Sequence, residues 1–203
     1  GELLARGNTD NQIIFTSAAT SPSAGDWANI EFLSDATDAQ FDSNDDYLSG
    51  SVIEHAQILY GGGSSKSGAL QTNQASIFLN QTTIRFSASS GFSLIGQQGG
   101  CMSGSECKSL TKVANSAFED NAGDGMTLSC CPKVTVEGTS LSRNTQGISA
   151  PGGWVLTLTA NTIDSNSGTG VSIHNASPLT FTGNTVSNNG GKGVLLRSGN
   201  YIV

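Results

Sequence analysis

The chain has 203 residues, of which 36% are hydrophobic and only 12% charged, and its formal net charge is −7. Serine, glycine, threonine and asparagine occupy 29, 26, 19 and 16 positions, and these residues disfavour helices while favouring strands and turns. This composition argues against a helical protein, the negative charge argues against a nucleic-acid partner, and no apolar run reaches the roughly 18 residues of a membrane span.

In chain order, the first predicted strands lie at 13–15 and 27–32, after a strand-like opening at 1–5. The segment 52–58 is the next predicted strand, and its Ile58 lies 26 residues before Ile84. From residue 79 onward the sequence becomes periodic, with apolar residues such as Leu141, Ile163 and Val186 spaced by 22 and 23 positions.

Five successive units share this period, so each position of the unit forms a column through the chain. Three columns are apolar: Leu79, Val113, Val136, Leu158 and Phe181; Ile84, Phe118, Leu141, Ile163 and Val186; Phe92, Met126, Ile148, Val171 and Val194. Two columns are polar: Thr82, Ser116, Thr139, Asn161 and Asn184; Ser87, Asn121, Asn144, Asn166 and Asn189. A glycine precedes each member of the third apolar column, and we expect it to supply a backbone φ that other residues resist.

Alternation of apolar and polar residues over two to four positions predicts short strands, which are not stable alone. If each unit makes three such strands and closes into one coil, its backbone pairs with the coils above and below. The apolar columns then become an interior stack, and the Asn and Thr columns become hydrogen-bonded ladders. We therefore predict an all-β, right-handed single-stranded parallel β-helix, a solenoid of roughly 7–9 coils with loop insertions. An antiparallel β-sandwich is the alternative, but it would show turns every 8–12 residues without this period.

The N-terminal run resembles a known family. The residues Leu3 to Thr9, then Ile13 to Ser17, then Gly25 to Phe32 are similar to the "G-T…I-x-F-T-S…G-D-W-x-x-I-x-F" pattern that precedes the regular repeats of secreted pectin-lyase-like β-helix proteins. This resemblance implies the fold rather than the activity, because the superfamily includes lyases, hydrolases, epimerases, adhesins and structural proteins.

We expect one β-helix domain over 1–203 that forms part of a longer solenoid. It divides into irregular acidic coils at 1–60 with an insertion at 33–50, coils at 61–133 with a loop at 95–109, and regular coils at 134–203. Both insertions follow the strand of the third apolar column, so they should leave the solenoid at the same edge.

Four cysteines lie in one stretch: Cys101, Cys107, Cys130 and Cys131. An even number of cysteines favours disulfides and a secreted protein, and we expect two bridges that fasten the 95–109 loop to the next turn. A Cys130–Cys131 vicinal bridge is an alternative that strains the bond geometry, and zinc ligation is another, although the spacing matches no common zinc site.

Residues 1–54 hold ten acids and one base, Arg6. Within them Asp42, Asn44, Asp45 and Asp46 offer clustered oxygen ligands that suit Ca²⁺, and a solvated acidic loop is the alternative. We expect no other cofactor.

Two N-x-[ST] sequons, at Asn80 and Asn175, predict glycosylation in an extracellular protein. Glycoside hydrolysis needs two carboxylates roughly 5–10 Å apart, whereas we expect Glu119, Asp120, Glu137 and Asp164 on different coils and faces. We also expect surface or turn roles for His55 and His174, so we expect no catalytic site in this segment.

The sequence thus predicts an extracellular or cell-surface β-helix protein with a structural, adhesive or filament-forming role. Its expected partners are copies of itself stacked end to end, another surface protein, or a polysaccharide, with no membrane insertion. The alternative is a polysaccharide-processing enzyme (lyase, hydrolase or epimerase) or a carbohydrate-binding module of the pectin-lyase-like class.

Overall fold

The computed structural model describes residues 1–96, 110–129, 133–152, 155–176 and 178–197. Every regular element in these ranges is a β-strand, and no helix occurs among them. All strand pairs are parallel except the small hairpin of β4 (Gln40–Phe41) and β5 (Tyr47–Ser49). The predicted all-β parallel architecture is confirmed.

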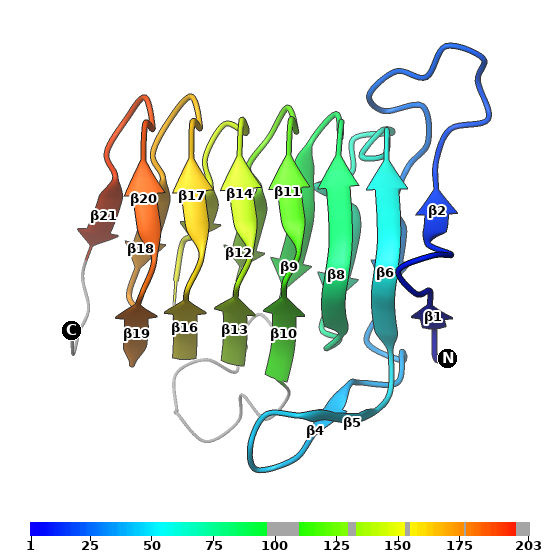
Figure 1. Ribbon diagram of the computed structural model, residues 1–203, viewed down its shortest axis with the longest axis horizontal. Helices are drawn as coiled ribbons and strands as arrows, with labels where there is room; N and C mark the ends of the chain where they lie inside the picture. Colours follow the sequence, from blue (N-terminus) through cyan, green and yellow to red (C-terminus); the bar gives the residue numbers. More distant parts are fainter. Residues whose placement is uncertain (97–109, 130–132, 153–154, 177, 198–203) are drawn as a thin grey trace.

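The described strands form seven coils, stacked side by side along the long axis (Figure 1). Coil 1 comprises β1 (Leu4–Arg6), β2 (Ile13–Phe15) and β3 (Ile30–Phe32). Coil 2 comprises β6 (Val52–Leu59) and β7 (Gly68–Asn73), and coil 3 comprises β8 (Phe78–Arg85) and β9 (Ser90–Ile95). Coil 4 comprises β10 (Leu110–Ala114), β11 (Ala117–Glu119) and β12 (Met126–Ser129). Coil 5 comprises β13 (Lys133–Glu137), β14 (Ser140–Ser142) and β15 (Ile148–Ala150). Coil 6 comprises β16 (Val155–Thr159), β17 (Thr162–Asp164) and β18 (Val171–His174). Coil 7 comprises β19 (Leu179–Thr182), β20 (Thr185–Ser187) and β21 (Val194–Arg197).

Two sheets enclose the core. Sheet A has twelve strands and contains the first two strands of each coil, which merge into the single long strands β6 and β8 in coils 2 and 3. Sheet B has seven strands in the order β21-β18-β15-β12-β9-β7-β3. The predicted three-strand coil is therefore correct, and two of its strands share one sheet.

The three apolar columns stack as predicted. In sheet A, Leu158 pairs with Val136 on one side and Phe181 on the other, and Ile163 pairs with Leu141 and Val186 in the same way. In sheet B, Phe92, Met126, Ile148, Val171 and Val194 are aligned in one register. Residues one coil apart in the sequence thus cover one another, which buries most of these side chains completely.

Both polar columns form ladders. In the second, the backbone N–H of Asn121 donates to Asn144 Oδ1 at 3.1 Å, and the backbone N–H of Asn144 donates to Asn166 Oδ1 at 3.0 Å. The Asn144 side-chain amide also donates to the Phe118 carbonyl at 2.9 Å. The first ladder repeats this pattern from Thr82 to Asn184. These bonds satisfy backbone groups at corners, where strand pairing is interrupted.

A single left-handed residue turns each of these corners. Asp120 and Arg143, with φ of 55° and 56°, directly precede Asn121 and Asn144. His55, with φ of 46°, occupies the equivalent place at the other corner of coil 2, in agreement with its predicted turn role.

The glycine column has a different cause from the one predicted. Gly125 and Gly170 are not among the residues with positive φ. A Cβ at Gly125 would lie 2.7 Å from the Gly147 carbonyl oxygen, and one at Gly170 would lie 2.6 Å from that of Gly193. Glycine is required because the next coil approaches this close, and not because of its φ.

The insertion at 33–50 follows β3 of sheet B, and β9, which precedes the second predicted loop, belongs to the same sheet. β3 and β9 thus end at the same edge of sheet B, and the departure of the second loop from this edge stays a prediction. Residues 97–109 themselves lie outside the described residues.

Candidate functional site

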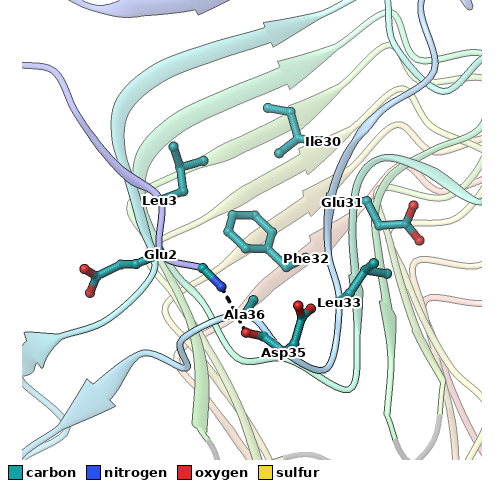
Figure 2. Close-up of a pocket in the computed structure, with 9 residues that line it drawn as sticks. Glu2, Leu3, Ile30, Glu31, Phe32, Leu33, Asp35 and Ala36 are labelled. Atoms are coloured by element: carbon teal, nitrogen blue, oxygen red, sulfur yellow. Dashed lines mark hydrogen bonds between the residues drawn. The ribbon is translucent and has the colours of Figure 1, made fainter.

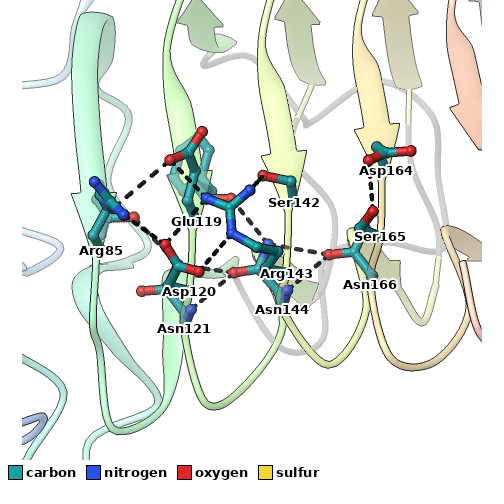
Figure 3. Close-up of polar contacts among 12 residues, drawn as sticks. Arg85, Glu119, Asp120, Asn121, Ser142, Arg143, Asn144, Asp164, Ser165 and Asn166 are labelled. Carbon is teal, nitrogen blue, oxygen red and sulfur yellow. Dashed lines mark hydrogen bonds and ion pairs between the residues drawn. The ribbon is translucent and has the colours of Figure 1, made fainter. Parts of the chain in front are cut away.

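The outer corner of sheet A carries a cluster of alternating charges (Figure 3). Arg85, Glu119, Ser142, Asp164 and Ser187 are aligned across coils 3 to 7 by the strand register. The left-handed corner residues form a second row beside them: Phe86, Asp120, Arg143, Ser165 and Asn188. Parallel in-register strands bring these charges together although they are far apart in the sequence.

Asp120 is the centre of this cluster. Its carboxylate accepts hydrogen bonds from Arg143 Nε at 2.6 Å and from Arg85 Nη2 at 2.7 Å. Glu119 accepts from Arg143 Nη2 at 3.1 Å. The Arg143 hydrogen bond, followed by the Arg85 contact, holds the pKa of Asp120 below its ordinary value, and Asp120 in turn raises the pKa of Arg143. Asp120 therefore favours the ionised form, which suits charge pairing more than proton donation.

Asp164 continues the row two coils further along. Ser187 Oγ donates to its carboxylate at 2.6 Å, Ser165 Oγ at 2.7 Å and Asn188 Nδ2 at 2.8 Å. The Ser187 hydrogen bond, with those of Ser165 and Asn188, lowers the pKa of Asp164. The expectation of different coils is right, because Glu119 and Asp120 belong to coil 4 and Asp164 to coil 6. The expectation of different faces is wrong for these three residues, because one register places them along a single corner.

Asp124 differs from these carboxyls. It lies in the turn before β12, and burial raises its pKa, although Thr127 and Gln146 partly offset this by hydrogen bonding. Thr127 Oγ1 donates to its carboxylate at 3.3 Å and is 2.9 Å from Ser90 Oγ. Among the described carboxyl groups with a resolved pKa shift, Asp124 is the one whose pKa is raised.

The residues predicted to bind calcium make contacts in different places. Asp42 Oδ1 accepts the backbone N–H groups of Asn44 and Asp46 at 2.8 and 2.9 Å, which closes a local turn. Asp45 points to Lys133 instead, with Oδ1 3.0 Å from Nζ. Across the described ranges, no group of three or more His, Cys, Asp or Glu residues is arranged to hold a metal, and calcium remains a prediction.

The two sequons lie in different settings. Asn80 is half-buried within β8, where its amide donates to Glu54 at 3.3 Å and accepts from Asn115 at 3.2 Å. Asn175 is exposed, directly after β18. Cys101, Cys107, Cys130 and Cys131 lie outside the described residues, and the predicted disulfides remain predictions.

Coil 1 carries an open pocket of about 300 Å³. Figure 2 shows Leu3, Ile30 and Phe32 facing one another there, with Glu31 directed away. The Gly1 amino group donates to the Asp35 carbonyl at 3.0 Å at its rim.

No helix in the described ranges could cross a membrane.

Seven in-register coils with interior polar ladders define a right-handed parallel β-helix protein. The sequence model of the family described as "Right handed beta helix region" matches residues 51–203, and the chain belongs to this family. No curated protein and no solved structure matches the chain.

Proposed function

We propose that this chain is a structural or adhesive module of an extracellular β-helix protein. The observation that carries the proposal is the uninterrupted stacking of columns and ladders through coils 3 to 7. The nearby surface carboxylates Glu119, Asp120 and Asp164 are all held by cations or hydroxyl and amide groups. A β-helix whose carboxylates at this corner already have partners suits a structural module better than a hydrolase, which needs a free acid and a free base at a defined separation.

The extracellular setting is supported by the even number of cysteines and by the exposed sequon at Asn175. Charged residues make up only 12% of the chain, whereas serine and threonine together occupy 48 of its 203 positions.

The strands of coils 1 and 7 support end-to-end association. Among the described residues, β1 and β2 pair only with β6, β3 only with β7, and β19, β20 and β21 only with coil 6. Val194 and Leu196 of the last coil are exposed, although Val194 continues an interior column. Strand edges that have no partner among the described residues are suited to pairing with a further coil, either of the same polypeptide or of a second copy.

The test is to label intact and lysed source cells with an antibody against this chain and to image the purified protein by electron microscopy. We expect labelling of intact cells and straight rods or filaments. Labelling restricted to lysed cells would contradict the extracellular role, and isolated compact particles at all concentrations would contradict end-to-end association.

A second candidate, polysaccharide binding or cleavage, is favoured by Asp124. Burial raises the pKa of Asp124, which favours a carboxyl that can donate a proton, and Thr127 Oγ1 lies 3.3 Å from it. Incubation with acidic and neutral polysaccharides distinguishes the two functions. Cleavage that Asp124→Asn abolishes would replace the structural proposal, and we expect none.

A further inference from the structure

Residues 35–50, which we call the strap, run beside the edge of sheet A at which β6, β8 and β10 begin (Figure 1). The base of the strap is fixed to coils 1 and 2. The Thr37 N–H donates to the Gly1 carbonyl at 2.6 Å, and the Ser51 N–H and Oγ donate to the Thr37 carbonyl at 3.1 and 2.7 Å.

The middle of the strap is fixed to coil 3. The Ala39 N–H donates to the Ser76 carbonyl at 3.0 Å, and the Ser76 N–H returns a bond to Asp38 Oδ1 at 2.8 Å. The rings of Tyr47 and Phe78 are stacked with centroids 5.2 Å apart, and Phe41 meets Phe78 edge-on at 5.8 Å. Aromatic contacts of this geometry are favourable beyond the area that they bury.

The tip of the strap reaches coils 4 and 5 through one residue. Lys112 Nζ on β10 donates to the Asp45 carbonyl oxygen at 3.0 Å, and Lys133 Nζ on β13 donates to Asp45 Oδ1 at 3.0 Å. The Lys112 side chain is only 12% exposed, and its Nζ also pairs with Glu137 Oε1 at 3.1 Å. A cleft of about 310 Å³, lined by Phe41, Asp45, Leu110 and Lys133 among others, remains between the tip and the sheet.

These contacts break the usual rule for solenoids, in which each repeat touches only its neighbours. Lys133 and Asp45 are 88 residues apart in sequence: the strap connects coil 1 to coil 2 along the chain, and its tip reaches coil 5. We propose that the strap is an ionic latch: closed, it joins coils 1 to 5 into one cooperative unfolding unit, and it opens when the Asp45 charge pair is lost.

The latch is built to be reversible. The Asp45 and Lys133 side chains are 37% and 40% exposed, so their attraction is modest and is screened by salt. The aromatic contacts at Phe41 and Tyr47 do not depend on salt in this way. The charge pair at the tip is therefore the salt-sensitive part of the latch.

The experiment is hydrogen exchange of the full chain, comparing Asp45→Asn with the wild type. Asp45 has a φ of 61°, a conformation that asparagine adopts readily, so this variant keeps the local backbone. We expect amides of the strap and of coils 1 and 2, such as Thr37 and Ser51, to exchange about two- to fivefold faster. Coils 6 and 7 should exchange at the wild-type rate.

The matched control is Asp46→Asn, which removes the same charge from the adjacent residue, whose carboxylate is not part of the Lys133 pair. Lys133→Gln should reproduce the effect of Asp45→Asn from the other partner. High salt should bring the wild type to the exchange rate of Asp45→Asn and change that variant little. Wild-type exchange in both Asp45→Asn and Lys133→Gln would overturn the proposal, and so would equal effects of Asp45→Asn and Asp46→Asn.

Discussion

Asn166 Oδ1 accepts two hydrogen bonds from Asn144, one from its backbone N–H at 3.0 Å and one from its side-chain amide at 3.2 Å, although the two residues are 22 positions apart. The same relationship joins Asn121 to Asn144 and Asn166 to Asn189. One asparagine side chain per coil thus forms hydrogen bonds with the backbone groups at the corner of the preceding coil.

Asn144→Ala should destabilise the protein by about 2–4 kcal/mol, because it leaves the buried Asn121 N–H and the Phe118 carbonyl without their partner. Urea unfolding followed by circular dichroism measures this change. The control is the neighbouring Thr145→Ala, which removes only an exposed hydroxyl bond. Equal midpoints for the two variants would contradict a structural role for the ladder.

Gly147→Ala should cost about 1–3 kcal/mol, the range for overpacking. The new Cβ would lie against the Ile163 side chain and 2.6 Å from the Gly170 carbonyl oxygen. Gly193→Ala changes the same column at the last coil, where the nearest atom is 3.7 Å away, and should be almost neutral. Thermal unfolding of both variants tests the close-approach explanation, which fails if they are equally stable.

Asp120→Asn should lower the free energy of unfolding at neutral pH by about 0.5–1 kcal/mol, a modest value because Arg143 is about half exposed. Since the folded state lowers the pKa of Asp120, its contribution is present above the unfolded value of 3.8 and is lost as the pH falls through the folded pKa. The stability of the wild type should therefore decline more steeply than that of the variant below about pH 4. Parallel pH profiles would contradict the charge cluster.

Peptide mapping under non-reducing conditions should find Cys101 and Cys107 joined to Cys130 and Cys131. The sequence places the two pairs in successive turns, and this prediction concerns residues that the structure does not describe. Four free thiols would contradict both the bridges and the secreted setting.

The columns could be predicted from the sequence because periodic residues such as Leu141, Ile163 and Val186 repeat their chemistry with each coil. The charge cluster could not, because the corner residues Phe86, Asp120 and Arg143 share a position but not a residue type. Its signal was the position itself: the residue before each ladder residue always lies at the outer corner.

The strap was also beyond sequence reasoning. The acidic character of residues 33–50 indicated an exposed loop, but nothing local to Asp45 encodes its pairing with Lys133. Such a contact depends on where the coils place a lysine three coils away. The glycine column was found for the wrong reason, because sequence reveals a requirement for glycine without showing whether φ or space imposes it.

The most direct test of the in-register β-helix is a methyl nuclear Overhauser spectrum of the intact chain labelled at Ile, Leu and Val. The account predicts contacts from Leu141 to Ile163 and from Ile163 to Val186, repeated by Ile148, Val171 and Val194 in the third column. Contacts restricted to residues close in sequence, as in antiparallel hairpins, without the connections at 22 and 23 residues, would contradict it.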